Sequence, residues 1–360
     1  MTEKSIPTIT GTLTGDFAAD SPILAQAGAI IRAGGLVAFP TETVYGLGGN
    51  GLDSTASKKI YAAKGRPSDN PLILHIEDDS MLYMLAEDVT DTAELLIRDF
   101  WPGPLTLVVK ASSVVPKTVT GGLDTVAIRM PSHPAAAALI RAAGVPIAAP
   151  SANLSGKPSP TSASHVKEDL NGRIDMILDG GDVPIGLEST IVDVTGDVPV
   201  LLRPGYITVH DIKEVVGECL IDPAVLHKPE DGFVPKAPGM KYRHYAPKGT
   251  LSVVEGRPED VIRTINSLIE EAEKAGRSCA VLCADETASS YRGKVYILGC
   301  RAEEEEVAAA LFDTLRQLDT DGVEYIYSAA FPSENLGAAI MNRLLKAAGH
   351  RIIHAGEESL

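Results

Sequence analysis

The chain has 360 residues, enough for about two domains and a sizeable hydrophobic core, which rules out a single small module. Hydrophobic residues make up 44% of the sequence and charged residues 22%, and no apolar run approaches the ~18 residues that a membrane span requires. Lys and Arg number 32 against 48 Asp and Glu, so the net charge of −16 repels polyanions and argues against non-specific RNA binding.

The cysteines and the N-terminus indicate the compartment. Four cysteines match neither a disulfide framework nor a CxxC metal site; they are Cys219, Cys279, Cys283 and Cys300. Residues 1–7 are polar and lack the apolar core of an export signal. We expect reduced thiols, a cytoplasmic protein without membrane association, and no metal site built from protein ligands.

The first part of the chain alternates helical and strand-like segments. Residues 22–33 have helical spacing, Gly34 and Gly35 stop the helix, and residues 36–39 read as a buried strand. Further strand-like runs lie at 72–76, 105–110, 126–130, 145–149, 176–178, 190–194 and 200–202, several separated by alanine-rich helical segments such as 134–143. The pattern predicts a large α/β domain with a many-stranded twisted sheet over residues 1–210.

A linker and a second domain are expected to follow. After a short helix at about 210–216, residues 222–248 lose periodicity and carry five prolines, which predicts a long connection over 211–249. Strands then alternate with helices: the strands are 251–254, 279–283, 295–298 and 325–328, and the helices are 259–274, 303–318 and 336–348. This alternation predicts a smaller, Rossmann-like parallel α/β domain over 250–360.

Polar residues of the first domain gather where the predicted strands end. Residues 40–48 follow a strand, and their hydroxyls and glycines suit a turn that lines an opening. Lys64 and Arg66 lie two apart in a segment held by Gly65 and two prolines. They can converge on one phosphate or carboxylate, because both side chains favour such anions, although a solvated cationic loop explains them equally well.

Arg129 interrupts an apolar strand. A buried arginine needs a partner, so either an internal carboxylate or a substrate carboxylate pairs with it. A further cluster at 148–160 is rich in small and hydroxyl residues, and another runs from Gly186 through Glu188-Ser189-Thr190 to Arg203-Pro204-Gly205. The sequence contains no GxxxxGK[ST], GxGxxG, kinase, GxSxG or HExxH signature, so any nucleotide must be held in another way.

The segments 40–48, Lys64-Gly65-Arg66 with Asn70 and His75, 122–129 and Pro150-Ser151-Ala152-Asn153 together resemble the YrdC/Sua5 family of threonylcarbamoyl-AMP synthases. Order and spacing agree over essentially the first 210 residues. Residues 237–247, followed by the second α/β unit, resemble the long, two-domain Sua5 form. The resemblance therefore covers nearly the whole chain.

The resemblance implies an activity. Family members make threonylcarbamoyl-AMP and pyrophosphate from L-threonine, bicarbonate or CO2, and ATP with Mg²⁺, which the ATP phosphates mainly hold. The product serves the N6-threonylcarbamoyl modification of adenosine 37 in tRNAs that read codons beginning with A. A threonylcarbamoyl transferase machinery accepts the intermediate, and no stable direct binding of tRNA is expected.

The resemblance also implies site residues. The catalytic set is Lys64, Arg66, Ser151 and Asn153. Threonine is expected against Thr43, His75, Arg129, Ala149 and Ser189. ATP is expected against Arg66, Asn70, Thr125, Ser151, Asn153, Ser159, Arg203 and Tyr242, with Tyr245 as the alternative to Tyr242.

Both the carbamate and the mixed anhydride are sensitive to water, so the linker is a candidate lid: residues 237–247 are expected to fold over the nucleotide, with Lys241 and Arg243 meeting phosphate. Two other functions remain open. One is a non-catalytic RNA-binding module with a basic groove, which the acidic charge disfavours. The other is a related carbamoyl-adenylate enzyme that uses carbamoyl phosphate.

Overall fold

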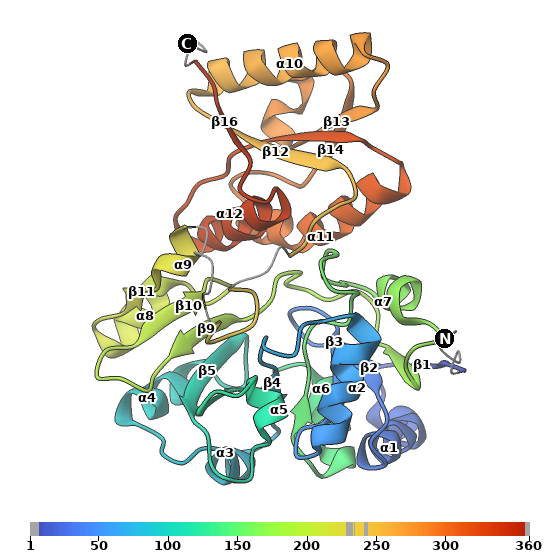
Figure 1. The fold of residues 1–360 in the computed structure, drawn as a ribbon, viewed down its shortest axis with the longest axis vertical. Coiled ribbons are helices and arrows are strands. Elements are labelled where there is room, and N and C mark those ends of the chain that lie inside the picture. The colour runs from blue at the N-terminus through green and yellow to red at the C-terminus, as the bar shows by residue number, and fades with distance from the viewer. Residues whose placement is uncertain (1–6, 228–232, 234, 241–243, 357–360) are drawn as a thin grey trace. The chain divides into compact units, whose positions relative to one another are not determined.

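The structure, a computed structural model, describes residues 7–227, 233, 235–240 and 244–356. The chain divides into two compact units (Figure 1). The first comprises Met1–Ser155 and Ser159–Lys241, and the second comprises Gly156–Pro158 and Tyr242–Leu360. The tripeptide Gly156–Pro158 thus belongs to the second unit, although its neighbours in sequence belong to the first.

An 11-stranded sheet runs through the first unit in the order β1-β8-β2-β3-β7-β4-β6-β5-β9-β10-β11. The strands are β1 (Ile9–Thr12), β2 (Val37–Phe39), β3 (Gly46–Asn50), β4 (Ile73–His75), β5 (Leu105–Lys110), β6 (Thr125–Arg129), β7 (Ile147–Ala148), β8 (Met176–Asp179), β9 (Thr190–Asp193), β10 (Val200–Arg203) and β11 (Leu220–Ile221). Parallel and antiparallel pairs both occur: β4 is parallel to β6, and β6 is antiparallel to β5.

Nine helices accompany this sheet in the described part of the first unit. They are α1 (Phe17–Arg32), α2 (Ser54–Lys64), α3 (Asp79–Leu85), α4 (Asp91–Phe100), α5 (Lys117–Thr120), α6 (Pro134–Ala143), α7 (Ala163–Leu170), α8 (Val209–Val216) and α9 (Pro223–Leu226). Helices α1 and α6 pack closely, because Gly28 brings α1 against the backbone of Ala142. A side chain at Gly28 would lie 2.6 Å from the Ala142 carbonyl carbon, so the approach requires glycine.

The predicted strands of the first domain are present, β1 and β11 are additions to them, and two further elements differ from expectation. The first helix begins at Phe17 rather than residue 22, because Asp16 caps it by accepting a hydrogen bond from Ala18 N. The predicted turn at 40–48 is wrong in its second half, since Gly46–Asn50 form β3 between β2 and β7. Its glycines admit neighbouring side chains: a Cβ at Gly48 would lie 2.7 Å from Ile147 Cγ2.

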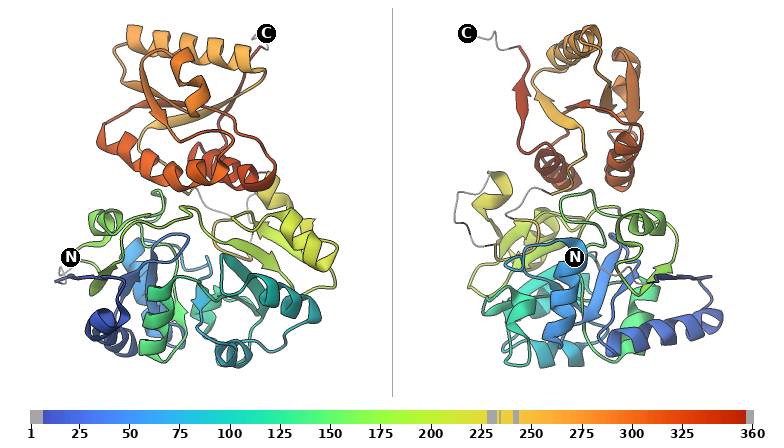
Figure 2. Two further views of the ribbon diagram at one scale, coloured as in Figure 1. Left: turned by 180° about the vertical axis from the view of Figure 1, so that it is seen from behind. Right: turned by 45° about the vertical axis from the view of Figure 1, so that its right-hand side comes forward.

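The second unit contains a five-stranded sheet whose pairs are all parallel, in the order β14-β13-β15-β12-β16. The elements are β12 (Thr250–Glu255), α10 (Pro258–Lys274), β13 (Cys279–Cys283), a 3₁₀ helix (Asp285–Ser290), β14 (Lys294–Ile297), α11 (Glu304–Thr320), β15 (Tyr325–Ala329), α12 (Asn335–Ala347) and β16 (Ile352–His354). Helix α10 covers one face of the sheet, and α11 and α12 cover the other (Figures 1 and 2). The predicted fold class is confirmed, and β16 and the 3₁₀ helix are additions to the elements predicted from sequence.

In the segment predicted as a linker over 211–249, the short helix expected at about 210–216 is present as α8, and β11 and α9 are additions to it. Helix α8, β11 and α9 occupy most of 209–226, and β11 extends the large sheet by pairing with β10. Ala237 and Met240 are buried in a hydrophobic cluster with side chains of the large sheet, among them Ile73, Val108 and Leu202. Because Ala237 and Met240 are buried there, this part of the predicted linker belongs to the hydrophobic core of the first unit. Among the described residues, the helices are too short or too polar to cross a lipid bilayer.

Candidate active site

Two parallel strands, β4 and β6, end side by side in polar residues. Their register places His75 opposite Arg129. On the other side of β4, β7 leads into Ala149, whose N–H donates to the carbonyl of Ile73 at 2.9 Å. Because ligands of open α/β sheets bind beyond the carboxyl ends of the strands, this edge is a natural site. His75 and Arg129, both predicted to bind threonine, therefore meet there, whereas Ala149 lies opposite Ile73, at the beginning of β4.

Arg129 is 3% exposed and makes three contacts. Its Nε donates to Gly103 O at 3.1 Å, and its Nη1 donates to Thr43 Oγ1 at 2.9 Å. Its Nη2 lies 2.6 Å from Oε1 of the buried Glu42. Of the two partners that the sequence left open, the structure thus shows an internal carboxylate. A substrate carboxylate on Arg129 stays a prediction.

His75 is buried and lies opposite Arg129 in the register of β4 and β6. Burial lowers the pKa of His75 to about 3, Arg129 adds to the effect, and Glu42 opposes it. The ring meets Phe39 edge to face at a centroid distance of 6.1 Å. Its Nδ1 is buried and has no hydrogen-bond partner among the described residues. At neutral pH the site therefore contains an uncharged imidazole with an unused polar atom.

Lys64, Ser151 and Asn153 form a second cluster. Helix α2 ends at Lys64 because Gly65 adopts a left-handed conformation at φ 62°. The Lys64 ammonium is buried and donates to the carbonyl of Ser151 and, at 2.5 Å, to that of Asn153. The Ser151 hydroxyl donates to Asn153 Oδ1 at 2.6 Å. Lys64 thus holds the loop that carries the other two residues.

Arg66 and Asn70 form the third cluster. Arg66 Nη2 donates to Pro71 O at 3.1 Å, and its Nε lies 3.4 Å from Asn70 O. Asn70 is 1% exposed, and its Oδ1 has no hydrogen-bond partner in the described part of the chain. Two residues predicted to bind ATP are therefore adjacent, with a buried amide oxygen unpartnered.

Ser189 and Arg203 connect the site to the segment after α9. Ser189 Oγ lies 2.7 Å from Thr106 Oγ1. The Arg203 guanidinium donates to Ser189 Oγ at 3.2 Å, to Ser189 O at 3.0 Å and to Pro238 O at 3.3 Å. Arg203 therefore joins a residue predicted to bind threonine to the predicted lid segment.

The remaining residues predicted to bind ATP are Thr125, Ser159 and Tyr242, with Tyr245 as the alternative to Tyr242. The Ser159 hydroxyl donates to the buried Glu188, and Thr125 begins β6 opposite Lys110. Tyr242, Lys241 and Arg243 lie outside the described residues. Tyr245 is 5% exposed and stacks on Phe312 at 5.0 Å within the second unit, so the structure gives its ring a packing role.

Sequence reasoning assigned no role to Glu42, Thr106 or Glu188. The buried Arg129 was the signal for Glu42, because a buried cation requires an anion and Glu42 directly precedes Thr43 in the motif. Nothing in the sequence pointed to the hydroxyl pair of Thr106 and Ser189. That contact depends on the parallel pairing of β5 with β9.

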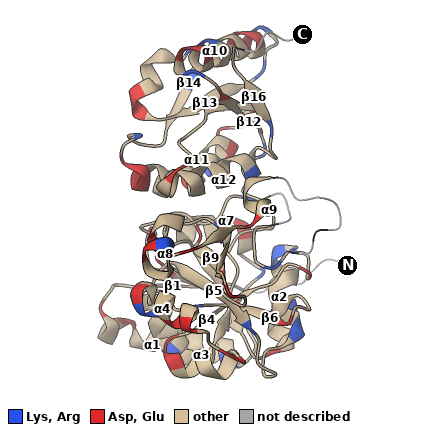
Figure 3. Ribbon diagram, turned by 90° about the vertical axis from the view of Figure 1, so that its left-hand side faces the viewer, with Lys and Arg blue, Asp and Glu red and all other residues tan. Residues whose placement is uncertain are grey.

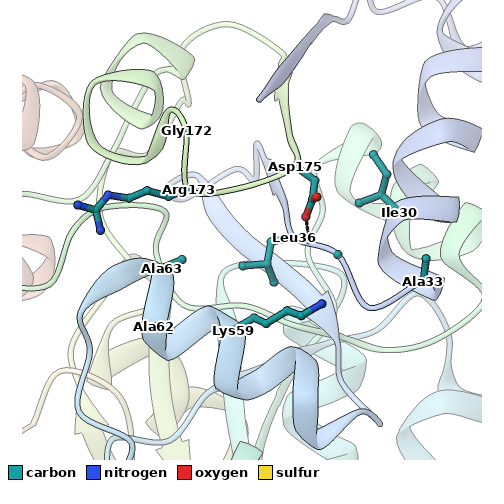
Figure 4. Close-up of a pocket in the computed structure, with 10 residues that line it drawn as sticks. Ile30, Ala33, Leu36, Lys59, Ala62, Ala63, Gly172, Arg173 and Asp175 are labelled. Carbon is teal, nitrogen blue, oxygen red and sulfur yellow. Dashed lines mark hydrogen bonds between the residues drawn. The ribbon is translucent and has the colours of Figure 1, made fainter. Parts of the chain in front are cut away.

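A cavity of about 510 Å³ lies elsewhere on the first unit, between α1, α2 and the loop before β8 (Figure 4). Ile30, Leu36, Lys59 and Arg173 contribute to its wall, and Asp175 Oδ2 accepts a hydrogen bond from Leu36 N at 2.8 Å. The residues predicted to bind substrates do not line it. It is therefore distinct from the site described above.

Charge is distributed without a large basic segment in the view of Figure 3, where acidic and basic residues are interspersed. Within the described ranges, no three His, Cys, Asp or Glu side chains gather as a set able to hold a metal ion. The predicted site residues include four cations, Lys64, Arg66, Arg129 and Arg203, each of which contacts carbonyl or carboxylate oxygens of the chain.

Comparisons with known proteins identify the family of the chain. The Sua5/YciO/YrdC family model, described as "Telomere recombination", matches residues 29–205, and the model "Threonylcarbamoyl-AMP synthase, C-terminal domain" matches residues 207–349. Proteins named threonylcarbamoyl-AMP synthase from Pyrococcus abyssi and Bacillus subtilis are 52% and 51% identical. These matches cover 91% and 95% of this chain, and 94% and 97% of those proteins. The solved structure of P. abyssi Sua5 complexed with L-threonine has a TM-score of 0.90 and 49% identity, covering 97% of this chain and all of that one.

The fold, the clustered site and these relatives define an enzyme that transfers nucleotidyl groups. The chain belongs to the Sua5/YrdC family. Matches to both family models, in this order, make it the long, two-domain form.

Proposed function

We propose that the protein synthesises L-threonylcarbamoyl-AMP from L-threonine, bicarbonate or CO2, and ATP, releasing pyrophosphate. The observation that carries the proposal is the buried cluster in which Lys64 fixes the loop of Ser151 and Asn153, close in sequence to Ala149 of the threonine site. Relatives named for this activity, and the threonine complex of one of them, support it. We further propose that the product serves the modification of adenosine 37 in tRNAs reading codons that begin with A.

The proposed reaction has two bond-forming steps. The neutral amine of threonine attacks CO2 and loses a proton, which gives a carbamate. A carbamate oxygen then attacks the α-phosphorus of ATP in line, and the bond to pyrophosphate breaks. Both partners of the second step are anions, so fixed positive charge must bring them together.

The residues present suit this chemistry. Arg129 offers guanidinium N–H groups to the threonine carboxylate, while the uncharged His75 and the Thr43 hydroxyl offer polar contacts without added charge. We assign Arg66, which lies beside Asn70, to the phosphates, because guanidinium groups bind phosphate well. Alignment of bound reactants can contribute about 7–11 kcal/mol to lowering the barrier. Positioning is therefore the main contribution that we assign to these side chains.

Magnesium fits the site as a companion of ATP. The cluster offers hydroxyl and amide oxygens at Ser151 and Asn153, which can meet the metal's water ligands, while the ATP phosphates supply its principal contacts. Bound Mg²⁺ supplies charge neutralisation at the phosphates. Lys64 holds the loop that carries both side chains by donating to its backbone carbonyls.

The proposal also includes the acceptor of the intermediate, the cellular location and the lid. The intermediate passes to a threonylcarbamoyl transferase machinery, and we propose no stable direct binding of tRNA. A cytoplasmic location accords with four free cysteines. The predicted lid over 237–247 accords with the burial of Ala237 and Met240 and with the contact of Arg203 to Pro238.

The test is incubation with ATP, Mg²⁺ and bicarbonate, with and without each amino acid, followed by assay of pyrophosphate. Threonine-dependent release is expected, with serine about 10- to 200-fold less effective because one methyl group separates the two substrates. Lys64→Ala should lower kcat/KM by about 10²- to 10³-fold, since it removes a group that organises the site. Lys58→Ala, at an exposed position of the same helix, is the matched control and should retain full activity.

Release that does not depend on an amino acid would contradict the proposal and indicate a simple nucleotidase. Release that requires carbamoyl phosphate in place of threonine and bicarbonate would favour the carbamoyl-adenylate alternative. Binding of tRNA with a steep salt dependence, without any pyrophosphate release, would favour the RNA-binding module.

A further inference from the structure

The side chains predicted to bind threonine have an unbalanced charge. Thr43, His75, Ala149 and Ser189 are uncharged at neutral pH, and Arg129 is a cation. Threonine, however, arrives as a zwitterion with one carboxylate and one ammonium group. A buried site made of these five residues would therefore suit a simple anion better than an amino acid.

Glu42 changes this balance. It is 6% exposed, and its Oε1 lies 2.6 Å from Arg129 Nη2 and accepts a hydrogen bond from Ser132 N at 3.1 Å. With Glu42 ionised, the charges of Glu42 and Arg129 cancel. Burial by itself raises the pKa of Glu42, but Arg129 and the Ser132 N–H outweigh burial and hold the pKa below its usual range.

The pair also leaves one buried oxygen without a partner. Glu42 Oε2 has no hydrogen-bond partner in the described ranges, whereas Arg129 Nη2 lies 2.6 Å from Glu42 Oε1. Glu42 Oε2 is therefore an anionic acceptor beside the cationic Arg129. An amino acid carries the matching ammonium and carboxylate, whereas a plain carboxylic acid carries one of the two.

We propose that Glu42 is a specificity-determining residue that makes the site select a zwitterionic amino acid over a simple carboxylate. It acts by neutralising and positioning Arg129. A zwitterion adds no net charge to the closed pair, whereas a plain anion adds an uncompensated negative charge to a buried site. The inference rests on the proposed threonine site.

The test compares two ligands by calorimetry without ATP: L-threonine, and 3-hydroxybutanoate, which differs from threonine by lacking the amine. The wild-type protein should bind threonine at least about tenfold more tightly than 3-hydroxybutanoate. A nearby charge shifts the pKa of an ionic group by about one unit or more, and one unit corresponds to a factor of about ten in an equilibrium constant. In Glu42→Gln this preference should fall by about tenfold, since Arg129 is no longer neutralised. Glu42→Asp keeps the charge and should retain most of the preference.

An unchanged ratio of the two affinities in a folded Glu42→Gln protein overturns the proposal, whether both affinities stay the same or fall together. Should Glu42→Gln fail to fold, the wild-type protein still decides, because equal affinities for the two ligands would overturn the proposal. Absence of threonine binding by the wild-type protein would instead refute the proposed function, and this inference with it.

Discussion

The two units of the chain use strand ends differently. In the first unit, β4, β6 and β10 end in His75, Arg129 and Arg203, and each of these side chains is buried. In the second unit, β13 and β15 end in the small residues Cys283 and Ala329, and β12 and β16 end in Glu255 and His354, whose side chains are 35% and 59% exposed. Both units build α/β sheets, but the first places buried charge at the edge where ligands bind in such folds. Function follows the chemistry at the strand ends rather than the sheet itself.

The largest expected effect concerns the core of the second unit. Phe312 is fully buried and stacks on Tyr245, so Phe312→Ala should lower the free energy of unfolding of this unit by about 3–5 kcal/mol. Threonine affinity should be unchanged, because the residues assigned to threonine belong to the first unit. The single tryptophan, Trp101, reports unfolding of the first unit by fluorescence, while circular dichroism reports both units. Equal loss in both signals, together with lost threonine binding, would contradict this separation.

A backbone clash beside the site should have the next largest effect. A Cβ at Gly205 would lie 2.4 Å from Thr190 N and 2.8 Å from Glu188 O. Gly205→Ala should therefore cost about 3 kcal/mol of unfolding free energy and weaken threonine binding through the displaced Ser189. Gly196→Ala is the matched control, because its Cβ would meet nothing closer than Val198 O at 4.0 Å. Urea unfolding with and without threonine measures both effects, and equal behaviour of the two variants would refute the prediction.

The buried imidazole should make stability depend on pH. His75 has a pKa near 3 when folded, against about 6.5 when unfolded, so the unfolded state binds the additional proton between these values. Stability should be full above pH 6.5 and fall with acidification, by about 2 kcal/mol at pH 5 from this residue alone. The free energy of unfolding, measured in urea at pH 7 and pH 5, should therefore change less with pH in His75→Gln than in the wild-type protein, by about 2 kcal/mol. An equal pH dependence in both proteins would contradict a buried neutral histidine.

The smallest effect is expected at an exposed ion pair of the second unit. Lys274 Nζ lies 2.7 Å from Glu270 Oε1, and both side chains are largely exposed. Solvent screening limits such pairs, so Lys274→Ala should leave the urea concentration at the midpoint of unfolding unchanged within experimental error. Activity should not change. A measurable decrease in that midpoint would show that the outer face of α10 contributes more to this unit than its exposure suggests.

The sequence by itself determined the regular part of the molecule. In the second unit, each predicted strand and helix is present, because continuous apolar strands and amphipathic helices are local patterns that tertiary packing reinforces. The motif residues of the first unit were also identifiable from spacing and resemblance. Strand β3 was not, since Gly46–Asn50 has little intrinsic strand preference and becomes a strand through pairing with β2 and β7.

The tertiary structure alone decided which groups meet. The sequence showed that Arg129 needs an anion, but the closeness of Glu42 depends on how the loop after β2 folds against the end of β6. Likewise, Lys64 could have faced solvent, and the structure instead buries it against the carbonyls of Ser151 and Asn153, 87 and 89 residues away. Periodicity and turn chemistry act over a few residues, whereas electrostatic pairing in a buried site is decided by elements distant in sequence.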